Sequence, residues 1–226
     1  KYRNKGVFTD RIGFDNRNPS FSGMELADPK GYYSMLAVVP AVFLVNTDEL
    51  GDRPVPRNWP DIWKPEFQGS VSLPVGDFDL FNALLLTLYR EYGMEAVDGL
   101  RSALFNSMHP SQMVKSDRMK GDRPCVTIMP YFFSKMVKDG GSLQLVWPED
   151  GAVLSPIFLL SKSGPESSSE DLREFYNFFQ SRDTAEILAL QGLFPTLHPE
   201  VDNNLPEGAR FKWVGWEYLE QDDMDK

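Results

Sequence analysis

The chain has 226 residues, a hydrophobic fraction of 42%, and 23 basic against 33 acidic residues, which gives a net charge of −10. This length and apolar content predict one large globular domain or two small lobes, and the acidic balance argues against a protein that binds nucleic-acid backbones. No apolar run approaches the roughly 20 residues of a membrane span, and the single cysteine, Cys125, excludes an intrachain disulfide and a zinc cluster.

The first predicted strand is long and contains a proline. Residues 1–31 are polar and irregular, and the stretch YYSMLAVVPAVFLVNT, residues 32–47, is rich in β-branched and aromatic residues. Pro40 lies in its middle, which argues against an ordinary central strand and suggests an edge position or a bend. The segment SVSLPV, residues 70–75, predicts a second, short strand.

Two helices are expected next. The segment GDFDLFNALLLTLYREYG, residues 76–93, has apolar residues on one face at helical spacing: Leu80, Ala83, Leu84 and Leu88. Asp77 can cap its start, and Gly93 is suited to its end. Residues 94–107 predict a second helix with its own apolar positions.

Strands and helices continue to alternate. The run CVTIMP, residues 125–130, predicts a buried strand, and a helix begins directly after it with three aromatic rings, Tyr131, Phe132 and Phe133. Two more strands are expected at residues 142–148 and 152–162. This alternation favours an α/β fold.

The last third of the chain is predicted to be helical and then irregular. The segment GPESSSE marks a break, and two helices are expected after it, at residues 169–181 and 183–192. The first of them carries a stripe of apolar side chains: Leu172, Phe175, Phe178 and Phe179. The irregular remainder contains one expected aromatic cluster: Phe211, Trp213 and Trp216.

Five segments in the same order carry a resemblance to a known family. They read VVPAVFLVNTDEL, RNWPDIWKPEFQGSVSLPV, GDRPCVTIMPYFFSKM, LVWPEDGAVLSPIFLLSKSG and DLREFYNFFQSRDTAEILALQGLFPTLHPEV. Together they resemble the extracellular solute-binding proteins of ABC importers, and most closely the group that includes ferric-ion-binding proteins. The resemblance implies a type II periplasmic-binding-protein fold, with a three-layer α/β/α lobe, two crossing hinge strands and C-terminal helices.

The same resemblance implies a division of the chain. Residues 1–36 would be a remnant of the first lobe and the start of a hinge strand, and residues 37–155 would be the second lobe. Residues 156–226 would be the return hinge strand, the C-terminal helices and the tail of the first lobe. Family members carry a longer run of strands and helices before the first hinge strand, so we expect a missing first-lobe segment. The polar start of the chain is no signal peptide, so any signal segment is also expected outside it.

The function that the resemblance implies is transport rather than catalysis. The protein would capture a small-molecule or ion solute between two lobes and deliver it to the membrane permease of an ABC importer, in the periplasm or outside the cell, with a lipid anchor left open. No cofactor and no nucleic-acid partner are expected. One alternative is the effector-sensing domain of a regulator on the same fold. A small α/β enzyme is a weaker alternative, because no nucleophile with its base and no phosphate-binding glycine motif is found.

Three grounds give eight candidate ligand-binding residues. Open α/β sheets bind ligands outside the carboxyl ends of their strands, which points to the rings after residues 125–130, and residues 76–78 lie at a strand-to-helix turn with free amides. The resemblance implies that the turn at residue 147 lies near the cleft and that residues 33–34 precede the first hinge strand. The candidates are Tyr131, Phe132, Trp147, Gly76, Asp77, Phe78, Tyr33 and Ser34. Each has a structural alternative: the rings can be core, and Asp77 can simply cap its helix. Tyr131 is the strongest candidate, with its hydroxyl exposed in a concave surface, whereas Phe133 is expected in the core.

No metal site is expected. His109 and His198 are far apart and lack a clustered carboxylate, so structural roles are predicted for both. Ferric-binding members carry adjacent tyrosines where this chain has Tyr131 and Phe132, so only one phenolate is present for a metal that prefers several hard oxygen ligands.

Overall fold

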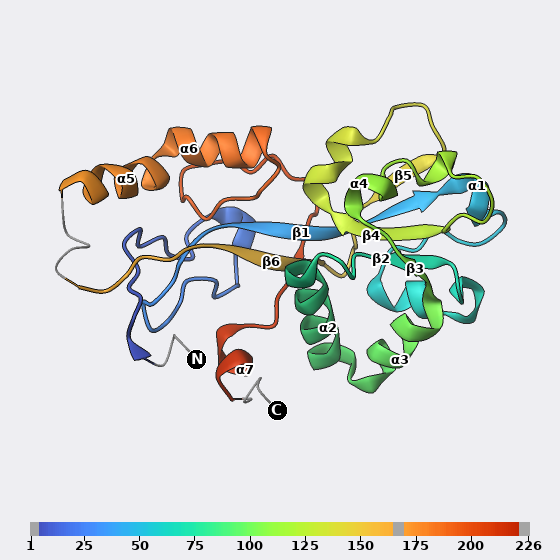
Figure 1. The fold of residues 1–226 in the computed structure, drawn as a ribbon, viewed down its shortest axis with the longest axis horizontal. Helices are drawn as coiled ribbons and strands as arrows, with labels where there is room; N and C mark the ends of the chain where they lie inside the picture. The colour runs from blue at the N-terminus through green and yellow to red at the C-terminus, as the bar shows by residue number, and fades with distance from the viewer. Residues whose placement is uncertain (1–4, 165–169, 222–226) are drawn as a thin grey trace. The chain divides into compact units, whose positions relative to one another are not determined.

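The computed structural model describes residues 5–164 and 170–221, and the chain divides into two compact units. Unit 1 comprises Lys1–Val38, Pro156–Leu205 and Gly215–Lys226, and unit 2 comprises Val39–Ser155 and Pro206–Val214. Figure 1 shows the elements of both units.

A mixed sheet is built from seven strands. They are β1 (Ser34–Asn46), β2 (Val71–Leu73), β3 (Leu104–Ser107), β4 (Val126–Pro130), β5 (Leu143–Val146), β6 (Ala152–Leu159) and β7 (Phe211–Lys212). Their order is β3-β2-β4-β1-β6-β7, and β5 also pairs with β1. β2 runs parallel to β3 and β4, whereas β1 runs antiparallel to β4 and β5.

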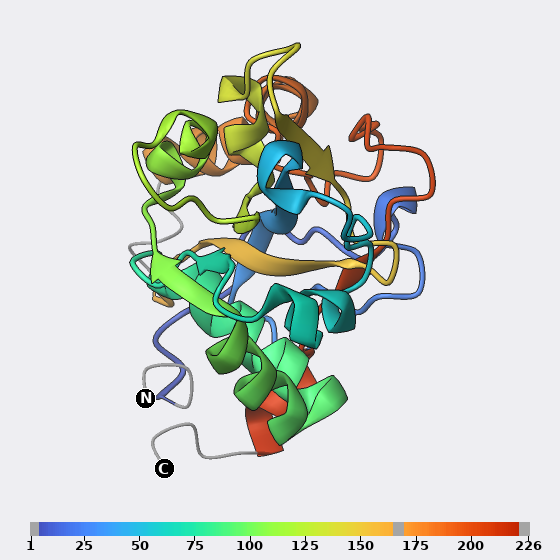
Figure 2. The same cartoon turned by 90° about the vertical axis from the view of Figure 1, so that its right-hand side faces the viewer.

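Helices cover both faces of the sheet in unit 2. Since successive residues of a strand point to opposite faces, β1 contributes apolar side chains to a core on each face. Phe43 and Val45 of β1 belong to a core with the long helices α2 (Phe78–Tyr92) and α3 (Met94–Ala103). Val42 and Leu44 belong to a second core on the other face. Unit 2 also contains the short helices α1 (Thr47–Leu50) and α4 (Pro110–Met113), and 3₁₀ helices at Trp59–Trp63, Pro65–Phe67, Ser116–Arg118 and Tyr131–Met136. Figure 2 shows the green helices α2 and α3 on one side of the sheet and the yellow-green segments on the other.

The predicted helix at residues 76–93 is confirmed almost to its ends. Asp77 accepts a hydrogen bond from the Leu80 amide at 3.3 Å and caps α2, and Gly93 ends it with a φ of 64°. The helix predicted over residues 94–107 is wrong in its last four residues. Leu104–Ser107 forms β3 instead, because its backbone pairs with β2, a contact that helical periodicity cannot reveal.

Pro40 does not place β1 at an edge, since β1 lies between β4 and β6. On one side of β1, Leu36 and Val38 form backbone hydrogen bonds with residues 195–197. Further along the strand, the Asn46 amide donates a backbone hydrogen bond to the Cys125 carbonyl. The pairing of β1 with β4 begins only at Ala41. Pro40, which has no amide hydrogen, therefore falls in the interval between two partners, and the strand continues through it.

In unit 1, the helices α5 (Glu170–Gln180) and α6 (Arg182–Glu186) follow one another, and α6 continues as a π-helical turn, Ile187–Gln191. The expected stripe on α5 is only partly correct. Phe179 packs together with Tyr176 against a core of residues from the chain start and β1, whereas Phe175 and Phe178 are exposed. None of the helices within the described residues is long and apolar enough to cross a membrane.

Two of the three rings expected to cluster near the end of the chain contact rings from other elements. Phe211 lies in β7 and contacts Trp147 in unit 2. Trp216 begins helix α7 (Trp216–Gln221) and packs against Tyr33 and Phe158 in unit 1.

Candidate functional site

The topology of unit 2 brings the ends of several strands to one edge of its sheet. β2, β3 and β4 are parallel, and β4 and β5 both run antiparallel to β1, so these four strands end in the same direction. Six of the eight predicted residues lie shortly after the end of one of these strands: Gly76, Asp77 and Phe78 after β2, Tyr131 and Phe132 after β4, and Trp147 after β5. We call this region the carboxyl edge of unit 2.

Tyr131 combines a packed ring with an available hydroxyl. Its ring is half-buried and meets the Trp147 ring edge to face, with centroids 5.2 Å apart and planes at 80°. Within the described part of the chain, its hydroxyl makes no hydrogen bond. Burial raises the pKa of Tyr131 above its usual value, so the phenol stays protonated at neutral pH and can donate a hydrogen bond.

Trp147 is held in place by a hydrogen bond and a second ring. Its Nε1–H donates to the Arg210 carbonyl oxygen at 2.9 Å, and its ring lies 5.5 Å from that of Phe211. Since the only polar atom of the indole is already paired, Trp147 can offer a solute an aromatic surface rather than a hydrogen bond. Phe211 could not be placed at this site from the sequence, because the pairing of β7 with β6 brings it there.

The neighbouring phenylalanines are less deeply placed than expected. Phe132 is half-buried, with its ring centroid 4.5 Å from that of Phe133. Phe133 packs against the core that contains Met129 but is itself only partly buried, so the expectation of a full core position is corrected to a half-buried one.

The turn after β2 presents an exposed ring beside acidic residues. Phe78 is 72% exposed at the first position of α2, and Gly76 is exposed as well. Asp77 caps the helix, as one alternative predicted, and Asp79 is exposed next to Phe78. The two carboxylates make this turn a poor place for an anion and a suitable one for a cationic or hydroxyl-bearing group.

The other two candidates, Tyr33 and Ser34, belong to unit 1 and have structural contacts there. The buried Ser34 hydroxyl donates to Asp10 and accepts from the amides of Arg11, at 3.1 Å, and Ile12, at 3.4 Å. The Tyr33 ring contacts those of Phe8, Phe158 and Trp216. These contacts explain both residues as parts of the packing of unit 1.

Each of the two histidines accepts a hydrogen bond from a backbone amide two residues further along the chain. The Nδ1 of His109 accepts from the Ser111 amide at 3.3 Å and caps α4, and the Nδ1 of His198 accepts from the Glu200 amide at 3.2 Å. In the described ranges, no three His, Cys, Asp or Glu side chains form a group that could hold a metal ion.

Comparison with known proteins gives one family and several structural relatives. The family model described as bacterial extracellular solute-binding protein matches residues 1–222. Spermidine/putrescine-binding periplasmic protein 1 of Haemophilus influenzae is 25% identical over 162 residues, which cover 66% of this chain and 44% of that protein. The chain therefore matches less than half the length of this curated relative.

Two solved structures illustrate the likeness of the fold. Ferric iron-binding protein A of Mannheimia haemolytica in an open conformation superposes with a TM-score of 0.66 and 14% identity, over 88% of this chain and 66% of that chain. A protein described as a two-component system protein that mediates signal transduction superposes with a TM-score of 0.69 and 14% identity, over 97% and 74%.

Proposed function

Because the chain belongs to the bacterial extracellular solute-binding protein family, we propose that it captures a small solute for an ABC importer and delivers it to the membrane permease. The family match over residues 1–222 is the observation that carries this proposal. The type II periplasmic-binding-protein fold predicted from the sequence is confirmed by the structural relatives. A periplasmic or extracellular location follows from the same family and is part of the proposal.

The carboxyl edge of unit 2 is the proposed contact surface for the solute. Tyr131 contributes a hydrogen-bond donor, and Trp147 and Phe78 contribute aromatic surface, a combination that suits pockets that are mostly apolar and hold a few polar groups. No bond of the solute is made or broken. Binding would act by population shift, since a solute that contacts two lobes only in a closed form favours that form.

The missing first-lobe segment belongs to this proposal. The curated relative is longer than the part that matches this chain, which supports a further segment in the intact protein. That segment would supply the second set of solute contacts, and residues 37–155 would form the second lobe.

The residues at the carboxyl edge favour some solutes over others. Asp77 and Asp79 favour a cationic or hydroxyl-bearing solute, and the name of the Haemophilus influenzae relative supplies one such class, the polyamines. Ferric binding through adjacent phenolates is disfavoured, because Phe132 has no oxygen to offer.

Titration of the intact gene product by calorimetry tests the proposal. The panel consists of spermidine, putrescine, a ferric chelate and a sugar phosphate. Tight binding of one member that is weakened in both Tyr131→Ala and Trp147→Ala supports it. Absence of binding, together with a helix-turn-helix segment in the intact sequence, contradicts it and favours the effector-sensing domain of a regulator.

A further inference from the structure

One region of this acidic protein is locally basic. Residues 113–142 contain six basic and three acidic side chains, whereas the whole chain has a net charge of −10. The basic residues are Lys115, Arg118, Lys120, Arg123, Lys135 and Lys138. Of these, Arg123 is bound to Glu49 in an ion pair of 2.5 Å, so its charge is already balanced.

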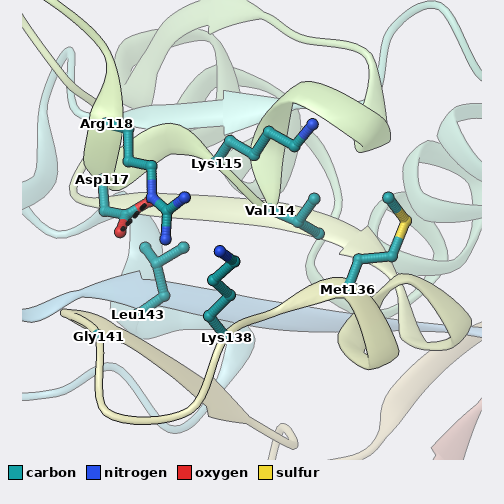
Figure 3. Close-up of a pocket in the computed structure, with 8 residues that line it drawn as sticks. All are labelled: Val114, Lys115, Asp117, Arg118, Met136, Lys138, Gly141 and Leu143. Carbon is teal, nitrogen blue, oxygen red and sulfur yellow. Dashed lines mark ion pairs between the residues drawn. The ribbon is translucent and has the colours of Figure 1, made fainter.

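A small pocket lies within this region (Figure 3). Its volume is about 40 Å³, and Val114 and Leu143 supply apolar surface to its lining. A site for one water molecule needs about 10–15 Å³ on this scale, so the pocket has room for a few atoms of that size. That matches a compact oxyanion better than an organic solute.

Positive charges meet at the pocket without enough negative charge to balance them. Figure 3 shows the Lys138 ammonium pointing into the pocket toward the Arg118 guanidinium, while Lys115 points aside. Arg118 has Asp117 as its neighbour, at 3.8 Å from Nε to Oδ2, which is an ion pair but too long for a hydrogen bond. Lys138 forms no ion pair with any described residue. Two like charges that face one another repel, and an anion between them would relieve the repulsion.

The pocket is separate from the carboxyl edge of unit 2. Leu143, which lines it, begins β5 and pairs with Asn46, whereas Val146, next to Trp147, pairs with Phe43. The two ends of β5 are therefore three residues apart, which is about 10 Å along a strand. A ligand in this pocket would not be the solute proposed above.

We propose that this pocket is an oxyanion site that holds a phosphate group between Arg118 and Lys138. The guanidinium can donate two parallel hydrogen bonds to two oxygens of a phosphate, and the ammonium adds a point charge with rotatable donors. The phosphate can belong to the free anion or to an anionic phospholipid headgroup, since the same groups would bind both.

Titration of inorganic phosphate into the protein at low ionic strength tests the site. Arg118→Gln and Lys138→Gln are each expected to weaken phosphate binding roughly tenfold, because each removes one charged hydrogen-bonding partner. Lys120→Gln is the matched control: it removes the same charge from an exposed position in the same loop but does not line the pocket. Near-ultraviolet circular dichroism of all three variants verifies that the fold is unchanged.

Co-sedimentation with vesicles distinguishes the two sources of phosphate. Binding to phosphatidylglycerol vesicles, but not to phosphatidylcholine vesicles, that is lost in Lys138→Gln identifies a headgroup. Binding of free phosphate without vesicle binding identifies the free anion. Equal weakening in Lys120→Gln, or no binding of either probe, overturns the proposal. Neither result bears on the solute titration, which concerns the other end of β5.

Discussion

Two tyrosine hydroxyls in unit 2 have opposite surroundings. The Tyr92 hydroxyl donates to Asp150 at 3.1 Å and accepts from Lys212 at 3.4 Å, whereas within the described residues the Tyr131 hydroxyl makes no hydrogen bond. Burial, with hydrogen bonds and nearby carboxylates adding to it, raises the pKa of Tyr92, so its phenol is a protonated donor in the fold. The Tyr92 hydroxyl therefore stabilises the fold, whereas the Tyr131 hydroxyl is available for the proposed hydrogen bond to a solute.

Tyr131→Phe is expected to separate binding from stability. It should change the free energy of unfolding by less than about 0.5 kcal/mol. It should weaken solute binding by about 1 kcal/mol through loss of one hydrogen bond. Tyr92→Phe, the matched variant, should lower the free energy of unfolding by about 0.5–1.5 kcal/mol in urea denaturation. Equal destabilisation by the two substitutions would show that the Tyr131 hydroxyl is structural.

Phe132 leads to a second expectation at the residue scale. Addition of a ferric chelate to the intact protein should give no visible phenolate-to-iron band, because Phe132 supplies no second phenolate beside Tyr131. Absorption spectroscopy of the wild type and of Tyr131→Phe makes the measurement. A band that disappears in Tyr131→Phe would contradict the expectation.

Cys125 should make stability depend on alkaline pH. Burial raises the pKa of its thiol from 9.0 to about 11, with Arg53 opposing this effect and Glu49 adding to it. The folded state thus holds the proton more tightly than the unfolded state. The resulting stability is fully present below pH 9.0 and is lost as pH rises through about 11. Urea denaturation across this range should show a steeper loss in the wild type than in Cys125→Ala, and parallel curves would refute it.

At the scale of elements, β7 approaches the turn before β6 very closely. Gly151 has a φ of +115°, and a Cβ there would lie 2.9 Å from the carbonyl carbon of Phe211. The Ala152 amide donates to the Arg210 carbonyl at 2.8 Å, and Trp147 donates to the same oxygen. Only glycine permits this approach, so Gly151 is what allows Phe211 to reach Trp147.

Gly151→Ala is expected to destabilise the protein more than Gly140→Ala. Gly140 also has a positive φ, of +71°, but its Cβ would meet nothing within 4 Å. Gly140→Ala should therefore cost only the backbone strain, about 1–2 kcal/mol, whereas Gly151→Ala adds about 1–3 kcal/mol of overpacking. Urea denaturation followed by tryptophan fluorescence compares them, and equal midpoints would show that the contact with β7 yields easily.

At the scale of the whole molecule, the proposed function includes a first-lobe segment outside residues 1–226. The curated relative extends beyond the part matched by this chain, and the proposed first-lobe segment would provide half of the solute contacts. We therefore expect the 226-residue chain to bind its solute more weakly than about 1 μM, in contrast to the intact gene product. Calorimetry on both proteins measures the difference. Sub-micromolar binding by the shorter chain would disprove the need for a further segment.

What the sequence determined by itself is local. The periodicity of α2, its cap at Asp77 and its end at Gly93 depend on residues within a few positions of one another, and all three could be predicted. The position of Tyr131 and Trp147 after strands could be predicted for the same reason, because each follows a recognisable apolar run.

Only the tertiary structure decided the features that depend on distant partners. Residues 104–107 form a strand because β2 lies beside them, and Pro40 is accommodated inside the sheet because it falls between two partners of β1. Phe211 reaches Trp147 through a pairing with β6. Local propensity carries no information about which distant backbone will supply a hydrogen bond. These parts of the fold and of the candidate site therefore depend on tertiary contacts and could not be predicted from the sequence.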